Sequence, residues 1–229
     1  MAMTQHRLKS DERCEAIRTA LREVFAEKGF DGATTRDLAK AAGVSEALLY
    51  RHFPSKKAMY EAISEGCLGT QEERELHAAV ELEPSAQTLV LMAHWIIAKI
   101  VRGTTDKAKA VDTLAVRSML EDGDFMRALV QSRMTPISAK LEECLSAARK
   151  KGETIPEMRP TDIETWLVHA VGLGIRLPLK PARPVLESRL NREEIIERCV
   201  WFCLLGLGLK GDVIKKHYNP KALSLLAAV

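Results

Sequence analysis

The side chains best placed for chemistry lie between Ser45 and Lys56, in the stretch SEALLYRHFPSK. If a helix begins after Ser45, Leu49 and Phe53 stand one turn apart and face a core. The side chains left outward carry carboxylate, phenol, guanidinium and imidazole groups, which suit hydrogen bonding and ion pairing with base edges and phosphates. They are Glu46, Ala47, Leu48, Tyr50, Arg51 and His52.

Two short helices and a tight turn are predicted to position these side chains. Thr34 can cap the first helix, and Asp37 can reach back to the backbone of Thr34, as in a capping box. Gly43 lies where the chain must reverse and can adopt a positive φ. Ser45 then caps the second helix, and Pro54 ends it. This helix-turn-helix pattern predicts that one end of the second helix enters a DNA groove.

The segment TTRDLAKAAGVSEALLYRHFPSKKAMYEAI, residues 34–63, resembles the DNA-binding segment of the TetR family of bacterial transcriptional regulators. Gly43, the Leu-Tyr pair, Phe53 and Lys56 fall together in the register of that family, and the resemblance covers residues 11–71. It implies an all-helical homodimer, usually a repressor released by a small ligand. By this resemblance the DNA-binding residues are Thr35, Arg36, Ser45, Glu46, Ala47, Leu48, Tyr50, Arg51, His52 and Lys56.

We expect these residues to divide into two groups. Arg36, Tyr50 and Lys56 would bind mainly phosphate and set the register on the duplex. The side chains nearest base edges or thymine methyls would be Glu46, Leu48 and His52. Glu46 and Leu48 depart from the neutral polar residues that often occupy their positions in the family, so base preferences cannot be carried over from a relative.

Charge and hydropathy agree with a DNA-binding protein outside the membrane. Residues 1–60 hold 11 Lys and Arg against 8 Asp and Glu, whereas residues 61–229 hold 23 of each. The whole excess of positive charge therefore lies in the part expected to meet phosphates. The longest apolar runs, 89–98 and 200–209, are about half of the ~20 residues that a membrane span needs. The N-terminus carries no secretory signal, so we expect a cytoplasmic protein.

The periodicity of apolar residues predicts an all-α fold with two domains. A helix-turn-helix DNA-binding domain is expected over residues 1–71, and a helical domain for ligand binding and dimerisation over 72–229. Met1–Lys9 is expected to be a mobile arm, and Gly66 and Gly69 are expected to break a helix that starts after Pro54. The other predicted helices are 10–28 before Gly29, 86–102, 107–120, 125–151 with an interruption near Pro136, 161–177 and 191–208; 77–84 is expected to be a loop.

Dimerisation is expected through the helices 161–177 and 191–208. Thr161 with Glu164, and Asn191 with Glu194, form capping boxes at their starts. Their wide apolar faces, with small residues such as Gly172 and Gly174, suit pairing with a second subunit. The resemblance implies a four-helix bundle across the dimer axis. The alternative from the residues alone is that these faces form the core of a monomer.

A small apolar ligand is the second expected partner. Residues that could line its pocket are Met92, His94, Trp95, Met119, Phe125, Met126, Trp166 and His169, although such residues at helical spacing are more often core. We expect no metal and no cofactor, because no ligand spacing accompanies the histidines. Cys199 and Cys203 are expected to be buried and reduced; the alternative is a redox pair between subunits.

Two other functions stay open. One is an architectural DNA-binding protein that responds to no ligand. The other is an all-helical enzyme with a similar helical motif, which is disfavoured because no nucleophile, base and orienting group can be assembled from the sequence.

Overall fold

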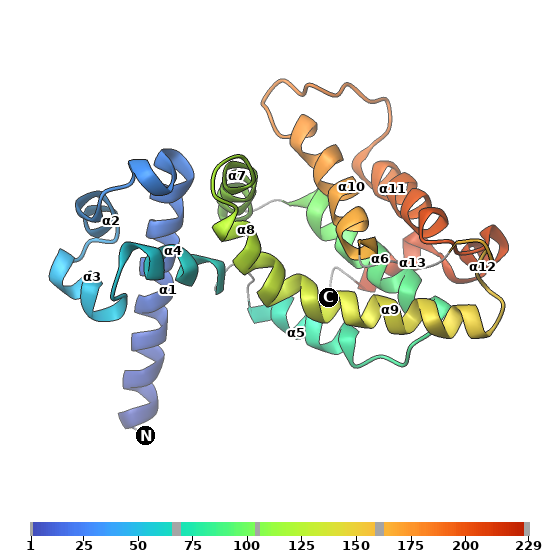
Figure 1. The fold of residues 1–229 in the computed structure, drawn as a ribbon, viewed down its shortest axis with the longest axis horizontal. Coiled ribbons are helices and arrows are strands. Elements are labelled where there is room, and N and C mark those ends of the chain that lie inside the picture. The colour runs from blue at the N-terminus through green and yellow to red at the C-terminus, as the bar shows by residue number, and fades with distance from the viewer. Residues whose placement is uncertain (1, 66–69, 104–105, 159–162, 227–229) are drawn as a thin grey trace. The chain divides into compact units, whose positions relative to one another are not determined.

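The computed structural model describes residues 2–65, 70–103, 106–158 and 163–226, and within these ranges the chain is helical and contains no strand (Figure 1). An isolated antiparallel bridge joins Thr154 and Leu209. The predicted all-α class is confirmed. The α-helices are α1 (Ala2–Gly32), α2 (Thr35–Ala41), α3 (Glu46–His52), α4 (Lys56–Glu65), α5 (Thr70–Val80), α6 (Ala86–Arg102), α7 (Asp106–Leu120), α8 (Asp124–Leu129), α9 (Thr135–Lys150), α10 (Glu164–Leu179), α11 (Arg192–Gly206), α12 (Gly211–His217) and α13 (Pro220–Leu226).

The chain forms two compact units that interleave along the sequence. The first consists of residues 1–73 and 104–133, and the second of residues 74–103 and 134–229. The first unit thus takes in α7 and α8, which were expected in the C-terminal domain. A domain boundary at residue 71 stays a prediction.

The first helix differs at its start from the expected one. α1 begins at Ala2 rather than Ser10, so the segment expected to be a mobile arm is helical. Gly29 has a φ of 73° and interrupts α1 where the sequence predicted its end. Nη1 of Arg117, on α7, donates to the carbonyls of Ala26 (3.2 Å) and Glu27 (2.8 Å) just before this break. Arg117 therefore supplies donors to carbonyls that the interrupted helix leaves without their usual partners.

The core of the first unit is built from α1, α4, α7 and α8 around aromatic rings. The ring of Tyr60 lies 5.0 Å from that of Phe25 and 5.9 Å from that of Phe125, measured between centroids. Arg22 is buried among these helices, and its guanidinium donates to the carbonyl of Ile63 at 3.3 and 3.4 Å. The aromatic contacts and this buried hydrogen bond tie α1 and α8 to α4, which follows the helix-turn-helix.

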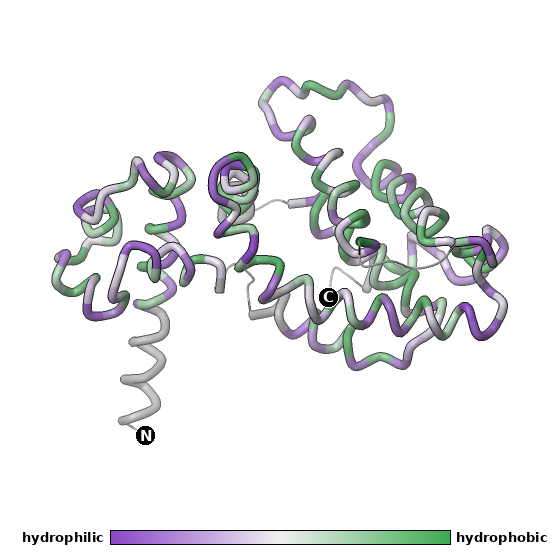
Figure 2. Tube along the Cα trace, in the orientation of Figure 1, coloured by the Kyte–Doolittle hydropathy of each residue, from purple (hydrophilic) through white to green (hydrophobic). Residues whose placement is uncertain are grey.

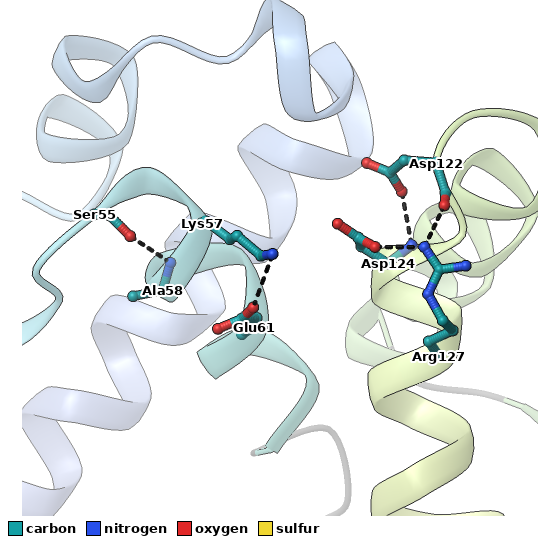
Figure 3. Close-up of polar contacts among 7 residues, drawn as sticks. All are labelled: Ser55, Lys57, Ala58, Glu61, Asp122, Asp124 and Arg127. Atoms are coloured by element: carbon teal, nitrogen blue, oxygen red, sulfur yellow. Dashed lines mark hydrogen bonds and ion pairs between the residues drawn. The ribbon is translucent and has the colours of Figure 1, made fainter.

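Side chains from neighbouring residues fix the starts of α4 and α8 (Figure 3). The hydroxyl of Ser55 accepts a hydrogen bond from the amide of Ala58 at 3.0 Å and caps α4. At α8, the side chain of Asp122 accepts from the amide of Asp124 at 2.8 Å. Arg127 pairs with the carboxylate of Asp124 and donates to the carbonyl of Asp122. Each turn is therefore stabilised within its own few residues.

The region after α4 differs in part from the prediction. α4 ends at Glu65, and the expected break at Gly66 and Gly69 lies outside the described residues. α5 continues to Val80, so the prediction of a loop from His77 was wrong for its first four residues, 77–80. α12 and α13 were not predicted.

Two prolines behave differently. The expected interruption near Pro136 is present as a π-helical turn, Val130–Met134, and Pro136 lies in the first turn of α9, where no intrahelical donor is needed. α10, in contrast, continues through Pro178 to Leu179. The predicted end of this helix at residue 177 was therefore two residues too early. Pro178 lies in the last turn, and its carbonyl accepts from the amide of Val185 at 2.8 Å.

The second unit packs α9, α10, α11 and α12 around the apolar α6, whose predicted limits are confirmed and whose start is capped by the side chain of Ser85. Figure 2 shows hydrophobic residues along α6, α10 and α11. An added Cβ at Gly172 would lie 3.0 Å from Ile100, so Gly172 allows α10 to approach α6 within one subunit. Arg176 is buried and donates to the carbonyls of Ile100 (2.9 Å) and Gly103 (3.2 Å) at the end of α6.

Candidate nucleic-acid interface

The start of α2 carries the predicted capping box. The amide of Asp37 donates to the hydroxyl of Thr34 at 3.1 Å, and the amide of Thr34 donates to the carboxylate of Asp37 at 3.2 Å. Hydrogen bonds from the side chain of Thr34 and from Lys28, which pairs with Asp37 at 3.0 Å, lower the pKa of Asp37 to about 2. The cap is therefore charged at neutral pH and favours the positive end of the helix dipole.

Gly43 makes the turn between α2 and α3. Its φ is 63°, and the amide of Val44 donates to the carbonyl of Ala39 at 3.0 Å across the end of α2. An added Cβ at Gly43 would meet no atom within 4 Å. The position therefore requires glycine for its backbone conformation and not for lack of space.

α3, the helix predicted to enter a DNA groove, is capped at its start, and its inner face packs against the first unit. The hydroxyl of Ser45 accepts from the amide of Leu48 at 3.2 Å, as predicted. Leu49 and Phe53 are buried in the first unit. The outer face is open to solvent, with Tyr50 45% exposed. The exposed residues of this face are Glu46, Ala47, Tyr50, Arg51 and His52, and Leu48 is half-buried.

The other predicted DNA-binding residues flank this face. Arg36 is exposed on α2, and the hydroxyl of Thr35 donates to Oε2 of Glu46 at 3.0 Å, which links α2 to α3. Nζ of Lys56 lies 4.6 Å from the centroid of the Phe30 ring and 3.4 Å from the carbonyl of Asp31. The structure thus places the ten predicted residues on α2, on α3 with its cap Ser45, and at the start of α4. Their binding of DNA stays a prediction.

Sequence reasoning missed the arginines that stabilise the first unit behind this face. Arg22 and Arg117 both donate to backbone carbonyls, and the groups joined by Arg117 are 90 and 91 residues apart in sequence. A local sequence pattern cannot predict a hydrogen bond to a carbonyl so far away in the chain. An arginine on the apolar side of α1, such as Arg22 beside Leu21, is the signal that was available.

The residues expected to line a ligand pocket do not form one set. Met119, Phe125 and Met126 belong to the first unit, where Phe125 contacts Tyr60 and Met119 is exposed. The other five belong to the second unit and lie on α6 and α10: Met92, His94, Trp95, Trp166 and His169. The eight residues are therefore divided between the two units, and their ligand role stays a prediction.

His94 and Trp95 have polar partners inside the second unit. Nδ1 of His94 lies 3.3 Å from the hydroxyl of Tyr218, and Nε1 of Trp95 donates to the carboxylate of Glu75 at 3.1 Å. Burial, followed by the positive charge of Arg102, lowers the pKa of His94 to about 4. His94 is therefore a neutral, hydrogen-bonded core histidine at neutral pH.

The lowered pKa of His94 predicts a loss of stability in mild acid. The unfolded histidine titrates near pH 6.5. Between pH 6.5 and 4 the unfolded chain therefore binds a proton that the folded chain does not, and the free energy of unfolding should fall as the pH drops through this window. Urea denaturation at pH 7 and pH 5 measures the effect. The variant His94→Gln should lose less stability than the wild type over this interval; an equal loss would assign the effect to other groups.

Cysteine and metal chemistry are not indicated by the described residues. Cys14, Cys144, Cys199 and Cys203 are free, and Cys67 lies outside the described ranges. Burial, with the neighbouring Cys199, raises the pKa of Cys203 to about 12, so its reactive thiolate is suppressed. Within the described ranges no three His, Cys, Asp or Glu residues are grouped to hold a metal ion. No helix of the described part is long and apolar enough to cross a bilayer.

The fold and the site define a helix-turn-helix protein with a second, all-helical unit. Residues 17–63 match the model of the family described as bacterial regulatory proteins, tetR family. Residues 17–63 therefore carry the DNA-binding segment of the TetR family of transcriptional regulators, as the resemblance predicted. The family is one of regulators and not of enzymes.

Individual relatives match over short segments. The nucleoid occlusion factor SlmA of Mannheimia succiniciproducens is 51% identical over 55 residues, which are 24% of this chain and 26% of SlmA. The biofilm operon icaADBC HTH-type negative transcriptional regulator IcaR of Staphylococcus aureus is 48% identical over 44 residues, 19% of this chain and 24% of IcaR. The matched part of the chain thus spans about a quarter of the length of these curated relatives.

The likeness in fold extends much further. The crystal structure of AibR in complex with isovaleryl coenzyme A and operator DNA aligns with a TM-score of 0.60 and 22% identity. The alignment covers 83% of this chain and 97% of AibR. The likeness in fold to AibR therefore extends beyond the helix-turn-helix, whereas the sequence likeness to the curated relatives is short.

Proposed function

We propose that the protein is a homodimeric transcriptional repressor of the cytoplasm, released from DNA by a small apolar ligand. Each subunit places α3 in one of two successive major grooves of a roughly palindromic operator, because a two-fold dimer requires two half-sites. The observation that carries this proposal is the outer face of α3. Leu49 and Phe53 hold the helix in the core, while Tyr50, Arg51 and His52 remain exposed.

Selection of bound sequences from a random DNA pool tests the proposal. A dimer of this kind should enrich an inverted repeat whose half-site centres are about one helical turn apart. Enrichment of single half-sites would contradict the dimer. Binding that enriches no motif would contradict sequence-specific regulation.

The contacts divide by the chemistry of each side chain. Arg36, Tyr50 and Lys56 bind phosphate oxygens and set the register, whereas Leu48 and His52 face base edges or thymine methyls with Glu46. Their positions support this division. The exposed Arg36 lies in the first turn of α2 and the half-buried Lys56 begins α4, and these helices precede and follow α3 in the chain.

Replacing Lys56 with alanine should weaken binding to every DNA sequence by a similar factor. One phosphate contact is lost, so the slope of log affinity against log salt should decrease by about one unit. Fluorescence anisotropy over a range of salt concentrations, on operator and on unrelated duplexes, measures both effects. Lys57→Ala is the matched control, since Nζ of Lys57 lies 3.9 Å from Glu61 on α4. A loss confined to one sequence would show that Lys56 reads bases.

The dimer is proposed to form through α10 and α11. Both helices leave large apolar side chains in solvent, and Phe202 is 69% exposed. An added Cβ at Gly174 or Gly206 would meet no atom within 4 Å, so these helices also have open positions for close approach. Faces of this kind mark protein interfaces. The exposed apolar residues are Ile163, Trp166, Leu167, Phe202 and Leu205.

Ligand control is proposed to act through the second unit. A small apolar molecule bound between α6 and α9 would favour a dimer whose reading helices are wrongly spaced, and its binding energy would be linked to release of DNA. The AibR structure, which contains isovaleryl coenzyme A and operator DNA, supports the presence of a ligand site in this fold. Short-chain acyl thioesters are suitable first probes. Ligands that bind without changing operator affinity would contradict this control.

A second candidate function is architectural DNA binding without a ligand. It is favoured by the 51% identity to the nucleoid occlusion factor SlmA over 55 residues. Mapping of bound sites across a genome separates the two. A repressor should occupy few operators near promoters, whereas an architectural protein should occupy many sites and respond to no small molecule.

A further inference from the structure

The outer face of α3 carries a carboxylate, that of Glu46, and a hydrogen bond from Thr35 holds it in place. The hydroxyl of Thr35, the first residue of α2, donates to Oε2 of Glu46, the first residue of α3, at 3.0 Å. Thr34, one residue earlier, is already engaged in the capping box with Asp37. The hydroxyl of Thr35 is therefore available to orient a side chain of the neighbouring helix.

The carboxylate of Glu46 remains an acceptor. Oε2 accepts from Thr35, and among the described residues neither an ion pair nor a second hydrogen bond engages Oε1. Glu46 is exposed beside Tyr50, Arg51 and His52. A negative charge on a surface that meets phosphates weakens binding to all DNA, and a base that donates a hydrogen bond to the carboxylate can offset this cost at one position.

We propose that Glu46 reads the amino group of a cytosine in each half-site and that Thr35 is the positioning residue that holds its carboxylate. The inference rests on the proposed function. In the major groove, cytosine presents only the N4 amino donor, which an oriented carboxylate can accept. Guanine presents two acceptors and thymine presents one, and all of them repel the carboxylate. Adenine places its N7 acceptor beside its N6 donor, so a carboxylate gains less there.

The test compares full-length variants in selection from a random DNA pool. The wild type should enrich a cytosine at one symmetric position of each half-site. Glu46→Gln should lose this preference by about tenfold and favour adenine at the same position, because an amide pairs with adenine N6 and N7. Thr35→Val keeps the carboxylate but frees it, so the cytosine preference should weaken without changing to another base. Preferences at all other positions should stay the same in each variant.

Glu142→Gln on α9 is the matched control, since it removes the same charge from an exposed residue of the second unit and should select the wild-type motif. If Glu46→Gln selects the wild-type motif and only binds all DNA more tightly, Glu46 acts by its charge alone and the inference fails while the proposed function stands. A Thr35→Val variant with undiminished cytosine preference would remove the positioning role. A wild type that enriches no motif would overturn both the inference and the proposed function.

Discussion

Replacing Phe202 with glutamate is expected to make the protein monomeric and to lower its affinity for a two-half-site operator by about a hundredfold or more. Phe202 is 69% exposed on α11, so a charge there should leave the folding of one subunit nearly unchanged. In the proposed dimer the same position is buried twice, once from each subunit, and an unpaired charge there would cost several kcal/mol. Sedimentation velocity and binding to the intact operator measure the two effects.

DNA binding should weaken because the two copies of α3 are no longer held together in one dimer. In a dimer, the second half-site is bound at a high effective concentration, whereas separate monomers must bind it independently. Leu120→Glu is the control, because Leu120 is 81% exposed on α7 and lies outside the proposed interface. A Phe202→Glu variant that still sediments as a dimer would contradict pairing through α11.

The second large effect is expected from Leu49→Ala, on the inner face of α3. The side chain of Leu49 is 0% exposed, and truncating a fully buried leucine typically lowers the free energy of unfolding by about 2–5 kcal/mol. Because Leu49 and Phe53 hold α3 to the first unit, DNA binding should fall together with stability. Chemical denaturation combined with anisotropy on operator DNA measures both quantities.

The adjacent Tyr50 provides the matched comparison. It is 45% exposed on the outer face of α3, so Tyr50→Ala should change the free energy of unfolding by less than about 0.5 kcal/mol. It should still weaken DNA binding, since a phosphate contact is removed. If Tyr50→Ala destabilised the fold as much as Leu49→Ala, the orientation of α3 described here would be incorrect.

The helix ends that sequence reasoning found were those with local partners. Thr34 with Asp37, Ser45 with the amide of Leu48, and Asn191 with Glu194 form their hydrogen bonds within three residues. Both members of each bond are therefore visible in one short window of sequence. The outward set of α3 followed from the same windows, because capping and helical periodicity together settle which side chains remain outside.

The elements that sequence reasoning missed lacked such partners. α12 has Lys210 at its N-cap with no side-chain hydrogen bond, and its buried Val213 and Ile214 belong to the core around α6. Such a short helix depends on packing for most of its stability. Pro178 is accommodated in the last turn of α10, and its carbonyl accepts from Val185 seven residues later, so proline alone did not mark the end of this helix.

The amino-acid sequence alone was enough to predict the reading helix, its caps and its outward residues, because short-range hydrogen bonds and periodicity specify them. Only the three-dimensional structure showed which elements cover each buried face. Apolar burial is not directional, so a pattern predicts that a face is covered and not what covers it. Arg176 and Ile100 are 76 residues apart, and His94 and Tyr218 are 124 apart. Contacts over such separations assigned α7 and α8 to the first unit, Gly172 to α6, and the candidate ligand residues to two separate units.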